Sequence, residues 1–98
     1  MKLWLISQSK NNDYDTYDSA VVAAETEEQA RRTHPDNKGS CDKVWDDSLG
    51  AWRHKDSPEA GWGVGRTWTE PHHVAIKYIG EAAEGTEPGV ICASFNAG

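Results

Sequence analysis

The sequence predicts an α+β fold: a mostly antiparallel four-stranded sheet with one short helix on a face, in the order β-β-α-insertion-β-β. Two observations carry this prediction. Four short segments have the apolar or alternating pattern of strands, and one capped segment has the pattern of a helix. A length of 98 residues is typical of one domain, so we expect residues 1–98 to form a single domain with a tryptophan-containing insertion at about 36–70.

The first two predicted strands form a hairpin with a long loop. Residues 2–8 (KLWLISQ) predict a strand in which Leu3 and Leu5 share one side and the other apolar residues share the opposite side. Residues 20–24 (AVVAA) predict its partner. Residues 9–18 (SKNNDYDTYD) are rich in turn-forming side chains and connect the two strands. Hairpin loops of this length are uncommon and are often functional.

A capping box begins the helix. The Thr26 hydroxyl can accept a hydrogen bond from the Gln29 amide, and the Gln29 side chain can return toward Thr26. Pro35 disfavours helical geometry in the residue before it, so we expect a helix over about 27–33. Ala30 is its one clearly apolar residue, so the helix can lie close to a sheet while burying little surface.

The insertion allows two interpretations. Trp45, Leu49 and Trp52 recur at the spacing of one helix face, but Gly50 interrupts that span. A broad hairpin over 44–53 (VWDDSLGAWR) fits equally well. The chain has few leucines and isoleucines, so we expect at least two of its tryptophans to lie in the core.

Two more strands follow the insertion. Residues 73–79 (HVAIKYI) predict a third strand that ends at Gly80. Residues 90–95 (VICASF) predict a fourth strand, in which Cys92 should pack as a small hydrophobic residue.

Charge and composition exclude several classes of function. The net charge is −6, and no basic cluster exceeds Arg31-Arg32, which disfavours direct binding to a nucleic-acid backbone. No apolar run has the length of a membrane span, and residues 3–6 are too short for the core of a signal peptide. Cys41 and Cys92 do not make a disulfide framework, so we expect a protein of a reducing cytoplasm.

Motifs for catalysis and metal binding are weak. Asp13, Asp15 and Asp18 place three carboxylates in one loop, but the loop lacks the glycine and closing glutamate of a calcium hand. Adjacent His72 and His73 would point to opposite sides of a strand. No nucleophile has an evident base partner. We therefore expect no enzyme, no metal and no cofactor.

Surplus aromatic and acidic residues instead favour contact with a partner or ligand. Tyrosine and tryptophan give large contact areas at low entropic cost. The predicted contact residues are Asp13, Tyr14, Asp15, Tyr17, Asp18, Trp45, Trp52 and Trp62.

Both ends of the chain resemble a group of short uncharacterised phage and prophage proteins. The resemblance rests on DYDTYDSAVVAAETEEQAR with HP following, on VAIKYIGEA, and on GVICASFNAG. It implies a cytoplasmic accessory protein in a bacterial host, and small proteins of that kind often occupy a host protein or sequester a signalling nucleotide.

The leading hypothesis is therefore a non-enzymatic accessory protein that binds and inhibits a host or anti-phage defence protein. One alternative is a sponge for a small signalling nucleotide, with aromatic side chains stacked on the base. A second alternative is a metal-dependent enzyme that uses the 13–18 loop or the histidines. The sequence does not indicate an oligomeric state.

Overall fold

The computed structural model describes residues 1–9, 16–37, 43–57 and 68–96. It confirms the predicted α+β class. The strands are β1 (Lys2–Ser7), β2 (Thr16–Ala24), β3 (Lys43–Asp46), β4 (Ala51–His54), β5 (Ala75–Glu81) and β6 (Gly89–Asn96). The helices are α1 (Glu27–Arg31) and the short 3-10 turn η2 (Pro71–His73).

The main sheet has the strand order β5-β1-β2-β6, and every neighbouring pair is antiparallel. The central pair holds the predicted alternation, since Trp4 lies opposite Val22 and Ile6 opposite Ala20. Gly80 lies inside β5 rather than ending it, next to an irregularity in the β1–β5 register. The φ angle of Gly80 is 151°, a value that suits glycine. This angle keeps the chain extended across the irregularity, so the strand continues.

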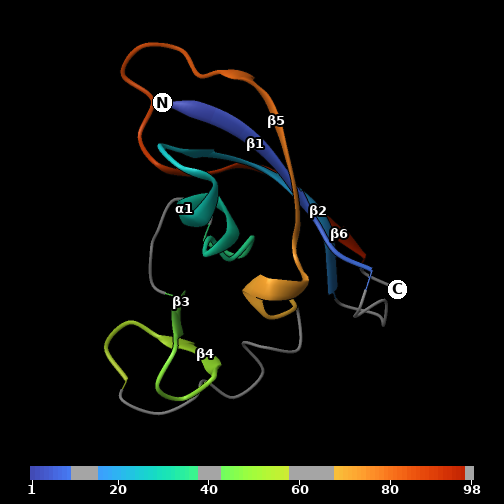
Figure 1. Cartoon of the computed structure of the whole chain (residues 1–98), viewed down its shortest axis with the longest axis vertical. Helices are drawn as coiled ribbons and strands as arrows, with labels where there is room; N and C mark the ends of the chain where they lie inside the picture. The colour runs from blue at the N-terminus through green and yellow to red at the C-terminus, as the bar shows by residue number, and fades with distance from the viewer. Residues whose placement is uncertain (10–15, 38–42, 58–67, 97–98) are drawn as a thin grey trace.

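One face of this sheet carries the core. Ile6 and Val22 are fully buried there, and Trp52 and Trp68 are almost fully buried against them. Helix α1 and turn η2 lie on this same side, and the β3–β4 hairpin lies beyond them (Figure 1). Ala30 has no exposed surface, so the small side chain lets α1 approach the sheet closely. The expectation of at least two core tryptophans is confirmed.

The capping box forms with one change from the expected pairing. The Gln29 amide donates to the Thr26 hydroxyl at 3.1 Å, while the Gln29 side-chain oxygen accepts from the Glu25 amide at 2.8 Å. The helix ends at Arg31, before the expected Thr33. The Thr33 amide bonds instead to the Ala30 carbonyl, which tightens the last turn.

The open question of the insertion resolves as a hairpin, because β3 and β4 pair with Trp45 opposite Trp52. The Asp46 carboxylate accepts hydrogen bonds from the Ser48 and Leu49 amides, which builds a turn in place of a helix. Gly50 follows with φ 63°, a left-handed value that other residues adopt at a cost.

Candidate functional site

The predicted tyrosine loop divides into two parts. Asp13, Tyr14 and Asp15 lie outside the described residues. Asp18 is exposed, but Tyr17 is only 6% exposed, and its hydroxyl donates to Asp36 Oδ1 at 2.9 Å. The expectation that Tyr17 is a surface contact residue is therefore wrong. Its ring packs on the core face of β2, where the sheet needs apolar area.

Tyr17, Asp36 and Lys43 form a small polar network at the edge of the core. Burial, followed by the hydrogen bond to Asp36 and its negative charge, raises the pKa of Tyr17 to about 12. Burial also pushes the pKa of Asp36 upward, but hydrogen bonds from Lys43 and Tyr17 outweigh it and lower that pKa below its ordinary value. The Lys43 ammonium lies 3.1 Å from Asp36 Oδ2. This network ties β2 to the start of β3.

One of the three predicted contact tryptophans lies in the core. Trp52 is 3% exposed, donates its indole N–H to the Thr69 carbonyl at 2.9 Å, and meets His34 edge to face. The prediction of a contact role for Trp52 is therefore wrong as well, because this indole closes the space between hairpin and sheet. Trp45 is half-buried against Trp52, and Trp62 lies outside the described residues.

The opposite face of the main sheet forms the first candidate surface. Strand alternation and register place ten residues on this open sheet face: Leu3, Leu5, Ser7, Ser19, Val21, Ala23, Ala75, Lys77, Cys92 and Ser94. All except Ala23 are half-buried or exposed. Within the described ranges, the elements that contact the sheet do so from the core side.

The open sheet face is apolar at its centre. A shallow depression of about 170 Å³ lies over Leu5, Val21 and Cys92. Cys92 is exposed, contrary to the expectation that it packs as a hydrophobic residue. The expected sharing of one face by Val90 and Cys92 is wrong, because the register irregularity between Val21 and Val22 leaves Val90 against the core and Cys92 on the side away from α1. Lys77 is the one charged residue among the ten, and none of the ten carries a carboxylate.

Carboxylates gather instead at one end of the sheet. The antiparallel order brings the start of β1, the end of β2, the end of β5 and the start of β6 to this end, where the 82–88 connection crosses (Figure 1). Four exposed glutamates form this acidic end: Glu25, Glu81, Glu84 and Glu87.

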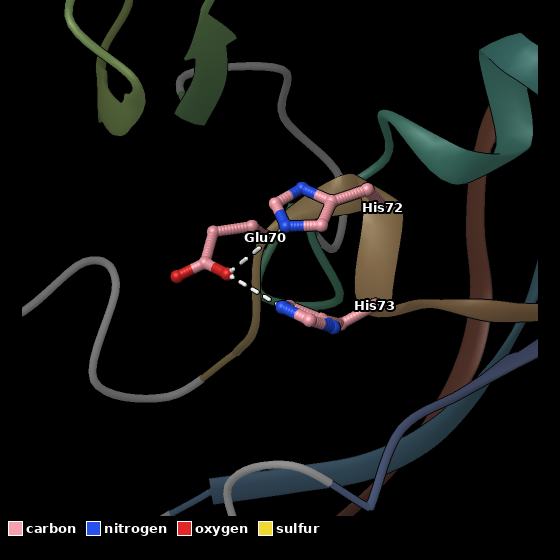
Figure 2. A group of neighbouring side chains, drawn as sticks. All are labelled: Glu70, His72 and His73. Carbon is pink, nitrogen blue, oxygen red and sulfur yellow. Dashed lines mark ion pairs between the residues drawn. The ribbon is translucent and has the colours of Figure 1, made fainter.

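The second candidate is the turn cluster of Glu70, His72 and His73 at η2 (Figure 2). Glu70 Oε2 lies 3.3 Å from His73 Nε2 and 3.8 Å from His72 Nε2. The two imidazole centroids are 4.2 Å apart. The expectation of histidines on opposite sides of a strand is wrong, because Pro71 begins a 3-10 turn and directs both rings toward one carboxylate.

Hydrogen bonds from two other elements hold this turn. The Arg31 guanidinium of α1 donates to the Pro71 carbonyl at 3.3 Å and to the Val74 carbonyl at 2.8 Å. The Trp52 bond to Thr69 fixes the chain on the other side. The side chains of the cluster are exposed while its backbone is anchored. The sequence signal that could have found this cluster is Glu-Pro-His-His, since Pro at the first position favours a helical turn.

No helix in the described part of the chain has the length and apolarity of a membrane span. Comparison with protein-family models, curated proteins and solved structures finds no match for this chain.

Proposed function

We propose that this protein acts by binding another protein through its open sheet face, without catalysis of its own. In line with the resemblance of its two ends, the target would be a bacterial host or anti-phage defence protein. The observation that supports this proposal is a sheet face with an apolar centre, whose ten assigned residues include no carboxylate, in a chain of net charge −6. Apolar side chains that are contiguous on an exposed surface, as Leu5, Val21 and Cys92 are here, mark interaction sites.

Charge favours a particular kind of partner. The open sheet face borders an acidic end of four exposed glutamates, so a complementary protein would carry an apolar patch flanked by lysine or arginine. Rim charges of this type mainly accelerate association and weaken with salt. A second copy stacked with its strands in the same direction would bring the two acidic ends together, and like charges disfavour that arrangement.

The test compares matched variants at exposed positions. Immobilised protein is incubated with bacterial lysate, and retained proteins are identified by mass spectrometry. The face variant is Cys92→Arg, and the control is Leu49→Arg, which adds the same charge to the exposed β3–β4 turn. We expect one protein to bind the original chain and the control, and its recovery to fall by about tenfold or more with the face variant, because an arginine would be desolvated there.

A second measurement uses the Cys92 thiol itself. In a Cys41→Ser background, maleimide should label Cys92 in the free protein. The purified partner should block that labelling at a 1:1 ratio. Unchanged labelling in the complex would place the partner elsewhere and overturn the proposal. Light scattering that finds a stable dimer of this chain alone, with Cys92 protected, would replace the partner by a second copy.

A further inference from the structure

We infer that Glu70, His72 and His73 form a surface site for one divalent ion of the zinc, nickel and copper class. This departs from the expectation that the chain binds no metal. The three ligand atoms lie within 4.8 Å of one another, and Figure 2 shows both imidazoles directed at the Glu70 carboxylate. The proposal concerns binding alone and is independent of the open sheet face.

The spacing of the ligand atoms is close to what such an ion requires. Metal–ligand distances near 2.1 Å in a tetrahedral site put neighbouring ligand atoms about 3.4 Å apart. The Glu70–His73 distance of 3.3 Å already meets this, the Glu70–His72 distance of 3.8 Å exceeds it by a few tenths of an ångström, and the ligand atoms of His72 and His73 lie within 4.8 Å of each other. The side chain of His72 is 69% exposed, so a small rotation of its ring can close the remainder without displacing packed neighbours.

The backbone under the cluster is already fixed. The His73 amide donates to the Glu70 carbonyl at 3.0 Å, which closes the turn and places the Glu70 and His73 side chains on the same side of it. Arg31 holds the Pro71 and Val74 carbonyls from α1. Because the turn is ordered before any ion arrives, binding loses less conformational entropy than it would on a free loop.

The ligand types select among metals. Two imidazoles and one carboxylate suit zinc, nickel and copper, whereas calcium and magnesium prefer six or more oxygen ligands. Three protein ligands leave positions that water can fill. The competing explanation is a plain ion pair between Glu70 and its histidines, which would show no preference for these ions.

The test is calorimetric titration of EDTA-treated protein with zinc chloride. We expect one ion per chain with micromolar affinity. His73→Ala removes one of three ligands and Glu70→Gln replaces a charged ligand by a neutral amide, so each should weaken binding by at least about tenfold, the lower bound for losing a residue that merely supports a ligand. The matched control is His54→Ala, an exposed histidine of β4 outside the cluster, which should leave the affinity unchanged. Millimolar affinity, or an equal loss in the control, would overturn the assignment.

A spectroscopic measurement on the unaltered protein does not depend on whether the variants fold. Electron paramagnetic resonance of the unaltered protein with one equivalent of copper(II) should show coupling to two ring nitrogens. A spectrum with a single nitrogen, or one identical to copper in buffer, would refute the site.

The anchoring bonds run to backbone carbonyls, so His73→Ala should keep the melting temperature of the metal-free protein. A tenfold excess of magnesium should not displace zinc.

Discussion

Replacing Tyr17 by Phe should lower the free energy of unfolding near neutral pH by about 1 to 3 kcal/mol. The substitution keeps the buried ring and removes only the hydroxyl, which donates to Asp36 Oδ1 at 2.9 Å. A hydrogen bond to a carboxylate is worth more than one between neutral groups. Lys43 still neutralises Asp36 in the variant through its 3.1 Å contact, which keeps the expected loss at the lower end of the range.

The pH dependence of this loss makes the prediction specific. The pKa of Tyr17 is raised to about 12 in the fold, while an unfolded tyrosine ionises near its ordinary value of 10.0. The contribution of the hydroxyl is complete below that ordinary value. Above it the unfolded chain ionises first, so stability falls by up to about 1.4 kcal/mol per pH unit as the pH approaches the folded pKa. The folded and unfolded pKa values of Tyr17 differ by about two units, so the total loss in the free energy of unfolding is about 3 kcal/mol at most.

The assay is urea unfolding followed by tryptophan fluorescence, at neutral pH and at steps through the alkaline range. Both proteins share the other tyrosines and the lysines, so the difference between them isolates Tyr17. That difference should be largest at neutral pH and should shrink toward zero as the pH nears about 12. A gap that stays constant across the alkaline range would refute the role assigned to the hydroxyl.

Two further substitutions test the packing of the core side. Ala30→Leu should destabilise the protein by about 1 to 3 kcal/mol, since Ala30 has no exposed surface and α1 would be pushed off the sheet; a melting temperature equal to that of the original chain would contradict this close approach. Trp52→Phe should cost about 1 to 3 kcal/mol, because the buried Thr69 carbonyl loses its indole donor and the smaller ring leaves space. Thermal unfolding measures that loss, with the exposed Leu49→Ala as a control expected to change little.

The main sheet could be predicted from the sequence because its information is local. Leu3 and Trp4 alternate as a strand must, and the β-branched valines in the short run ending at Ala24 favour a strand. The start of the helix is also predicted by a local signal, since Thr26 and Gln29 have the spacing of a capping box. Such signals require no knowledge of which element covers which.

The candidate surfaces could not be predicted because they depend on packing between distant segments. Alternation predicts Val90 and Cys92 on the same side of a strand, but the register irregularity between Val21 and Val22 separates them, and no local signal predicts it. Tyr17 and Trp52 carry polar atoms that would suit a surface. Their partners, Asp36 and Thr69, are 19 and 17 residues away in sequence, so the satisfied, buried arrangement has no local signal.

The distribution of large side chains explains why none of the described helices and hairpins covers the second sheet face. Helix α1 has five residues and contributes only Ala30 to the core, so it cannot fill the space above the sheet by itself. Trp52 from the hairpin and Trp68 from the segment before η2 fill that space instead. Both large aromatics are therefore used on the side of α1. Leu5 and Val21 on the other side keep only their strand neighbours among the described residues, and a binding partner would supply the missing contacts.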